Sequence, residues 1–190
     1  MAVNSAFGYA LAKFEFKGKN VILTVVLSLL VLPLESILLS LFFIVNKLGW
    51  VDSYLALIIP FIVKCFDVYL FRQFFLDVPD DLIEAAEIDG AGPFRVFFQI
   101  TFPLLKPITV TMTIFHVMGT WNDFVTPFLF LHTRNNATLM LEMYRGVGEF
   151  QSDWPLMMTT MVLIMAPLVV FYIFAQRYII DGLTNGAVKG

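Results

Sequence analysis

The sequence predicts an all-α membrane protein, a polytopic helix bundle that crosses the bilayer about five times. Of its 190 residues, 59% are hydrophobic and 14% are charged, whereas a soluble domain is usually about 45–50% apolar and about 25% charged. The mean hydropathy is +0.82, and the 21 phenylalanines suit helix surfaces that face a lipid bilayer. The mild formal net charge of −3 argues against nucleic acid as a partner.

The apolar runs define the crossings in order. Residues 2–12 make only about half a crossing, because a span needs about 20 residues. We therefore expect sequence to be missing upstream, and we treat residues 1–190 as one transmembrane domain truncated at its N-terminus. Full runs follow at residues 21–45, 54–71, 108–131 and 155–178. Two polar inserts, at 72–107 and 132–154, join them.

The distribution of basic residues orients these crossings. If the runs alternate in direction, most basic residues of the connections and of the C-terminal end fall on one side of the membrane: Lys13, Lys17, Lys19, Arg72, Arg95, Lys106, Arg177 and Lys189. The other side holds Lys47, Arg134 and Arg145. Cytoplasmic loops carry an excess of Lys and Arg. The first set is therefore predicted to be cytoplasmic, together with the insert at 72–107 and the C-terminus.

The cytoplasmic insert begins with a predicted short helix. Pro79 suits the first turn, where its missing N–H costs nothing, and Asp80 and Asp81 complement the positive end of the helix dipole. A narrow face of mostly small residues follows at Leu82, Ala85, Ala86 and Asp89. Gly90 can adopt the left-handed conformation that ends a helix.

A second short helix is predicted at residues 94–100, after Pro93. Its apolar side chains Val96, Phe97 and Phe98 are expected to lie along the membrane surface. The simplest interpretation of residues 77–107 is a plain cytoplasmic loop with two surface helices. However, so much local order is unusual for a linker of this length.

This stretch resembles the EAA loop of permeases from binding-protein-dependent ABC importers. Glu84-Ala85-Ala86, Asp89-Gly90-Ala91, Ile100 and Pro103 match its spacing, whereas Phe102 and Glu87 depart from the usual Leu and Arg. The resemblance extends to residues 9–19, 47–49, 71–75, 121–124 and 182–190. Together these segments are similar to the carbohydrate-uptake branch, and within it to the second permease of the maltose and glycerol-phosphate type.

The resemblance implies a type I ABC importer permease fold in a bacterial inner membrane. It implies a heterodimer with a second permease, two ATP-binding-cassette ATPase subunits, and an extracytoplasmic solute-binding protein. ATP and Mg would be bound by the ATPases, so this chain would carry no cofactor and would not be an enzyme. An ATPase cleft would receive the coupling helix through Glu84, Ala85, Ala86, Asp89, Gly90 and Ala91. A sugar or related solute would cross by alternating access.

Ionisable residues inside predicted spans are candidates for function, because they are costly there. Lys64 and Asp67 are three residues apart on one predicted helix, so they are either a self-neutralising ion pair or a pair that faces the solute. Glu35 and His116 near mid-span have the same two interpretations. Asn122 and Asp123 suggest hydrogen bonds between helices. The spacing of these residues predicts no metal site.

Three other functions remain as alternatives. An intramembrane enzyme that uses Asp67, Asp123 and His116 has no supporting catalytic motif. A channel or passive structural protein would need neither a docking helix nor an ATPase. A permease for a non-sugar solute is compatible with every feature above, because the sequence does not identify the solute.

Overall fold

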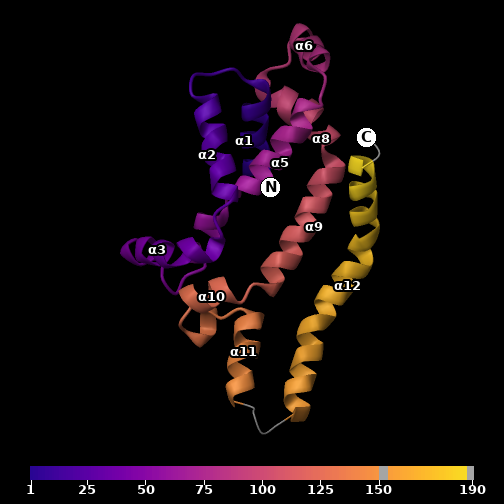
Figure 1. Cartoon of the computed structure of the whole chain (residues 1–190). Coiled ribbons are helices and arrows are strands. Elements are labelled where there is room, and N and C mark those ends of the chain that lie inside the picture. Colours follow the sequence, from indigo (N-terminus) through magenta and orange to yellow (C-terminus); the bar gives the residue numbers. More distant parts are fainter. Residues whose placement is uncertain (150–153, 188–190) are drawn as a thin grey trace. The chain divides into compact units, whose positions relative to one another are not determined.

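The computed structural model describes residues 1–149 and 154–187, and side-chain surroundings for residues 1–146, 154–155 and 157–176 (Figure 1). Every regular element in this part of the chain is a helix, as predicted. The chain divides into two compact units. Unit 1 comprises Met1–Leu34 and Phe61–Met112, and unit 2 comprises Glu35–Pro60 and Thr113–Gly190.

Unit 1 is built on helix α5 (Cys65–Leu76), against which α1 (Ala2–Lys13) and α2 (Lys19–Leu30) both pack. The closest approach is at Gly8, where an added Cβ would lie 2.8 Å from the Cβ of Phe71. Small residues let membrane helices approach in this way. Leu11, Val26 and Val68 form an apolar cluster that joins the three helices.

The insert after α5 folds into short helices at one end of unit 1 (Figure 1). These are α6 (Asp80–Ile88), α7 (Pro93–Arg95), a π-helical segment η2 (Val96–Thr101) and α8 (Phe102–Leu104). Val96 and Phe97 are only 1% and 6% exposed, so the prediction that they lie along the membrane surface is wrong, whereas the third residue, Phe98, is 57% exposed. Phe97 instead packs with Tyr9 and Phe75 in the core of unit 1.

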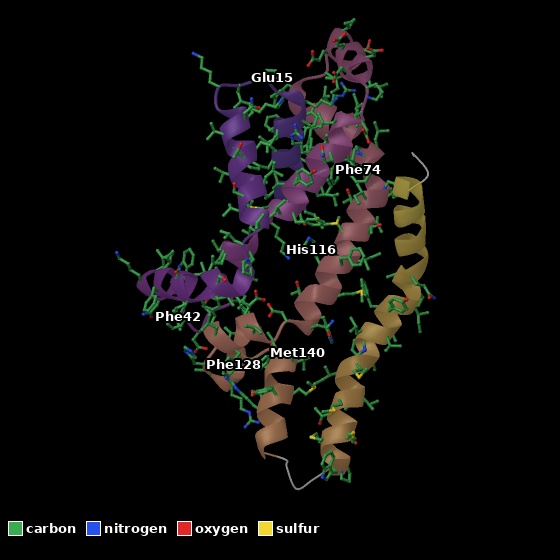
Figure 2. The ribbon with its side chains drawn as sticks, in the orientation of Figure 1. Glu15, Phe42, Phe74, His116, Phe128 and Met140 are labelled. Atoms are coloured by element: carbon green, nitrogen blue, oxygen red, sulfur yellow. The ribbon has the colours of Figure 1, made fainter. Side chains whose placement is uncertain are left out.

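Unit 2 contains α3 (Leu34–Lys47), α4 (Leu55–Ile58), α10 (Val125–Phe130), η3 (Arg134–Asn136), α11 (Leu139–Glu149) and α12 (Trp154–Ala187). Helix α9 (Lys106–Asn122) continues from one unit into the other. Aromatic rings join α3 and α10: the centroids of Phe42 and Phe130 are 6.1 Å apart. Phe42 and Phe128 can be followed in Figure 2. Helix α11 runs alongside α12.

The structure divides three of the four full runs that the sequence predicted as spans. The run at 21–45 is broken before Pro33, between α2 and α3, because proline cannot donate to the helix ladder. The run at 54–71 is divided into α4, η1 (Ile59–Phe61) and α5, with Lys64 extended just before α5. The run at 108–131 is divided between α9 and α10.

The fourth run agrees with the prediction, because Met157–Gln176 within α12 is apolar and long enough to cross a membrane. By length and composition, the described helices include this one span, or up to three if each of two bent helix pairs is one span. The pairs are α2 with α3, and Pro93–Leu104 with α9. Helices α1 and α5 are each shorter than a full crossing. Two parts of the predicted cytoplasmic tail lie outside what the structure describes: the side chain of Arg177, and residues 188–190, which include Lys189.

Candidate coupling site

Helix α6 begins with local signals that the sequence displays. Pro79 is the residue that precedes the first helical turn, with φ −59° and ψ 134°, so it lies one position earlier than predicted. Asp80 and Asp81 occupy the first turn, where their negative charge complements the helix dipole. The backbone N–H of Leu82 donates to the carbonyl of Pro79 at 3.3 Å. The first turn of the helix is therefore hydrogen-bonded.

The end of α6 is fixed by Gly90, whose φ is +80°. The N–H of Gly90 donates to the carbonyl of Glu87 at 3.0 Å, and the N–H of Ala91 donates to the carbonyl of Ala86 at 2.9 Å. These two bonds form a Schellman motif, which satisfies carbonyls that the helix would leave unpaired. The chain therefore turns sharply away after α6, as the sequence predicted.

Most of the predicted docking residues lie on the surface of α6 and the turn that follows. Glu84, Ala85, Asp89 and Gly90 are exposed, and Ala91 is half-buried. Ala86 is only 8% exposed and faces the rest of unit 1. The predicted face is therefore divided, because Ala85 is available to a partner whereas Ala86 belongs to the packing of the loop itself.

Sequence reasoning missed two apolar residues of this surface. Ile88 is 86% exposed at the end of α6, and Phe94 is 79% exposed on α7. The insert was predicted to be cytoplasmic, so these side chains would face water unless a partner covers them. The sequence signal that could have found these two residues is a large apolar side chain outside the face that a short helix buries.

Helix α6 is also attached to α1. The Lys13 ammonium donates to the carbonyl of Val78 and to the Asp80 carboxylate, both at 2.6 Å. Tyr9, one turn earlier, packs edge-on against Phe75 at a centroid distance of 5.1 Å. The end of α1 and the start of α6 therefore lie together, which agrees with placing residues 13–19 and 72–107 on one side of the membrane.

The predicted Lys64 and Asp67 pair is part of a wider contact between α1 and α5. Asp67 is 1% exposed in the first turn of α5, and its carboxylate accepts a 2.8 Å hydrogen bond from the Asn4 amide. The Asn4 side-chain oxygen accepts from the Lys64 backbone N–H at 3.3 Å. Because Lys64 lies just before the helix, in extended backbone, the two residues do not occupy successive turns of one helix as predicted. The sequence analysis missed Asn4.

The other candidate polar residues make local contacts or lie on helix surfaces. Glu35 is exposed in the first turn of α3, and His116 is half-buried on α9. The Asn122 amide donates to the carbonyl of Met118 at 2.8 Å, within its own helix. The Asp123 carboxylate accepts from the N–H of Thr126 at 3.1 Å, at the start of α10. These two bonds are within a helix or at its end, not between helices as predicted.

Within the part of the chain that the structure describes, no group of three or more His, Cys, Asp or Glu is placed to hold a metal ion.

Comparison with known proteins identifies the family. Residues 4–185 match the family described as binding-protein-dependent transport system inner membrane component. The chain belongs to this family. As a member of an inner-membrane transport family, it is a membrane protein, and its all-α class and resemblance are confirmed.

Individual relatives of this inner-membrane component are transport permeases. The arabinooligosaccharides transport permease AraQ of Bacillus subtilis is 36% identical over 187 residues, 98% of this chain and 66% of AraQ. The trehalose/maltose permease MalG of Thermococcus litoralis is 33% identical over 195 residues, 100% of this chain and 69% of MalG. The sn-glycerol-3-phosphate permease UgpE of Pectobacterium atrosepticum is 30% identical over 187 residues, 97% of this chain and 66% of UgpE.

The chain thus spans about two thirds of the length of these relatives. A solved structure also matches this family member: the crystal structure of a bacterial ABC transporter involved in the import of the acidic polysaccharide alginate. The TM-score is 0.77 over 93% of this chain and 69% of the matched chain, at 20% sequence identity. This likeness shows that the two chains share a fold. The relatives are permease proteins, which confirms the expectation of a transport subunit and not an enzyme.

Unit 2 of this inner-membrane component has its own polar centre, at Asp52. Its carboxylate accepts hydrogen bonds from the N–H groups of Thr133 and His132, both at 2.9 Å. These bonds lower the pKa of the Asp52 carboxyl to about 2. The Asp52 N–H donates to the carbonyl of Phe130 at 2.8 Å, and the Asn136 amide donates to the Asp52 carbonyl at 2.7 Å. The contacts join the two loops that the charge pattern placed on the non-cytoplasmic side.

Proposed function

We propose that the chain is a permease subunit of an ATP-binding-cassette importer that moves a sugar or related solute across a bacterial inner membrane. The observation that carries this proposal is the coupling segment. A short helix, fixed at both ends, presents Glu84, Ala85, Asp89 and Gly90 on its surface, in a chain of the binding-protein-dependent transport family. Such a surface is suited to docking with another protein.

The proposed partners follow from that role. Two ATPase subunits bind ATP and Mg and receive α6, a second permease completes a heterodimer, and a solute-binding protein delivers the solute from outside. Closure of the ATPases moves α6, and the membrane helices respond by alternating access as rigid bodies. In this arrangement α6 and the C-terminus lie in the cytoplasm. The contact between Lys13 and Asp80 supports placing the end of α1 on that side as well.

The class of solute is proposed from the relatives. AraQ and MalG are named for oligosaccharide and disaccharide transport, and UgpE for sn-glycerol-3-phosphate. A carbohydrate or a related polyol phosphate is therefore the favoured solute. A non-sugar solute is the alternative, and binding measurements on the solute-binding protein produced from a neighbouring gene would decide between them.

The central experiment compares Gly90→Trp with Gly18→Trp in the reconstituted transporter. Both glycines have positive φ, +80° and +92°, and neither has a heavy atom within 4 Å of an added Cβ. The backbone strain is therefore similar, at about 1–2 kcal/mol for a residue with a Cβ. Only Gly90 belongs to the proposed docking surface, so Gly18→Trp is the matched control.

We expect Gly90→Trp to abolish co-purification of the ATPases and ATP-driven uptake, while the permease still inserts in the membrane. Gly18→Trp should retain both properties. ATP-driven uptake by Gly90→Trp at the wild-type rate would overturn the assignment of the docking surface. Failure of the wild-type chain to associate with any ATPase, with its neighbouring permease present, would overturn the proposed function as a whole.

A further inference from the structure

Lys13 connects the first helix of unit 1 to the start of the coupling helix. Its ammonium contacts the Val78 carbonyl and the Asp80 carboxylate at 2.6 Å each. Val78 is the last buried residue before α6, at 6% exposed, and Asp80 is the first residue of α6. One side chain on α1 therefore holds both the end of the segment that leads from α5 and the first turn of the coupling helix.

The Lys13 side chain is only 8% exposed, whereas the Asp80 side chain is 73% exposed. A buried ammonium is costly unless acceptors surround it. Here a charged acceptor and a backbone carbonyl are both present, and hydrogen bonds to charged groups are stronger than neutral ones. Lys13 also lies in the last turn of α1, where the helix dipole favours a cation. The Lys13 ammonium is therefore held in place by its two acceptors and is not free in solvent.

Beside this contact the packing between α1 and α6 is incomplete. A cavity of about 220 Å³ lies there, and its lining includes Tyr9, Lys13, Asp80, Glu84 and Glu87. Apolar packing therefore does not fill the space between the two helices. The ion pair of Lys13 with Asp80, at 2.6 Å, joins the two helices beside this space. A force applied to α6 would reach α1 through the Lys13 side chain, in addition to the apolar contact of Ile83 with the cluster that contains Tyr9 and Ala12.

We infer that Lys13 is a positioning residue for energy coupling: it ties α6 to α1, so that displacement of the coupling helix moves α1 with it. The inference rests on the proposed function, because it requires that ATPases displace α6. Lys13 is not part of the docking surface itself. It acts on the start of α6, one turn before Glu84 and Ala85.

The test measures solute molecules imported per ATP hydrolysed, in proteoliposomes with the complete transporter. Lys13→Met keeps the length of the side chain but removes both bonds. Asp80→Asn removes the charge of one acceptor and keeps the bond to the Val78 carbonyl. Lys19→Met is the matched control, because Lys19, the first residue of α2, makes a similar 2.7 Å ion pair with Glu15. The amount of assembled permease and ATPase is measured in parallel.

We expect Lys13→Met to lower the ratio of import to hydrolysis about tenfold or more, the effect of losing a hydrogen bond to a charged group. The ATPases should still co-purify in the wild-type proportion. Asp80→Asn should give an intermediate ratio, and Lys19→Met the wild-type ratio. The inference is overturned if Lys13→Met keeps the wild-type ratio or if Asp80→Asn couples as well as Lys19→Met. It is also overturned if uptake falls only in step with the amount of assembled complex, which would make Lys13 a stabilising residue alone. The assay requires that the wild-type transporter binds its ATPases and imports solute. If it does not, the proposed function fails; if it does and Lys13→Met behaves as wild type, only the inference about Lys13 fails.

Discussion

Gly8 lies where the backbones of α1 and α5 come closest. An added Cβ would lie 2.8 Å from the Phe71 Cβ and 2.9 Å from both the Arg72 nitrogen and the Val68 oxygen. Two of these neighbours are backbone atoms, which cannot move aside by a change of rotamer. At the scale of single residues, the absence of one methyl group therefore sets the distance between two helices.

Gly8→Ala should lower the free energy of unfolding by about 1–3 kcal/mol, the usual cost of overpacking. The measurement is thermal unfolding of the purified permease in detergent. Gly119→Ala in α9 is the control, because no heavy atom lies within 4 Å of an added Cβ there, and alanine is favoured over glycine within a helix by about 0.5–1 kcal/mol. Equal melting temperatures for the two variants would contradict the close approach at Gly8.

We propose that Asp67 holds α1 and α5 together and does not contact solute. Asn4→Ala and Asp67→Ala should each destabilise the permease by about 1.5–3 kcal/mol, because each removes a buried hydrogen bond to a charged group. The double variant should lose less than the sum. A second cycle, of Lys64→Ala with Asp67→Ala, tests the ion pair through membrane abundance and uptake. A double variant that inserts at full abundance yet fails in uptake would instead assign the pair to the solute pathway.

Asp52 should make the stability of unit 2 dependent on pH in the acid range. Its pKa is lowered to about 2 in the folded protein, whereas an unperturbed Asp has a pKa of about 3.9. The stabilisation is therefore complete above about pH 4 and is lost as the pH falls toward 2. Asp52→Asn keeps an acceptor oxygen and tolerates the positive φ of 62°, but it cannot titrate. The melting temperature of wild type should exceed that of Asp52→Asn at pH 7, and the difference should shrink below pH 4. A difference that stays constant to pH 2 would exclude this role.

At the scale of elements, α6 presents two neighbouring alanines to different surroundings. Ala85 is exposed, and Ala86 is 8% exposed against the rest of unit 1. The family motif does not distinguish them, since both are part of the Glu-Ala-Ala triplet. The structure does, because a helix turns by about 100° per residue.

Ala85→Leu and Ala86→Leu should therefore fail in different ways. Leucine at position 85 should leave the melting temperature of the isolated permease unchanged and should reduce co-purification of the ATPases. Leucine at position 86 should overpack the loop and lower the free energy of unfolding by about 1–3 kcal/mol. If both variants lose ATPase binding with no change in stability, then Ala86 also lies at the docking surface.

The elements whose signals are local could be predicted from the sequence. Gly90 ends α6 in left-handed conformation, and the acidic first turn follows Pro79, because capping depends on a few adjacent residues. The burial of Val96 and Phe97 could not be predicted. The partners of Phe97, Tyr9 and Phe75 among them, come from other helices, so an amphipathic pattern could not distinguish a membrane surface from a protein core.

Hydropathy also could not predict the breaks in the apolar runs. Average hydropathy measures how apolar a run is, and does not show whether its helix is continuous. Pro33 and Pro60 mark two of the breaks, yet Pro167 lies inside the continuous helix α12. Neighbouring groups decide whether a membrane helix continues through a proline, and those neighbours are absent from the sequence of the run itself.

At the scale of the whole molecule, two sets of contacts connect loops that are distant in sequence. Lys13 contacts Asp80 in unit 1, and Asp52 contacts Thr133 in unit 2. Each contact requires its two loops to share one side of the membrane. These assignments agree with the distribution of basic residues, which was derived without any contact.

Cysteine labelling should therefore separate the exposed loop residues into two sets. In a Cys65→Ala background, cysteines at Lys17 and Asp81 should react with an impermeant maleimide only after the cytoplasmic side is opened. Cysteines at Asn46 and Asn135 should react in intact cells. All four side chains are exposed in the structure. Labelling of positions 81 and 135 from the same side would overturn the proposed orientation.

The distance in sequence between α1 and its partners has a consequence for synthesis. The bonds of α1 to α5 and α6 join residues 63, 65 and 67 positions apart. At about 5–20 residues per second, the ribosome needs roughly 3 to 13 seconds to produce those partners after α1 has emerged. During that time the Asn4 amide and the Lys13 ammonium must be hydrated or shielded by the insertion machinery, since hydrocarbon offers them no acceptor. Helix α1 is thus made before the residues to which it bonds, and it can take its final position only after α5 and the start of α6 have been synthesised.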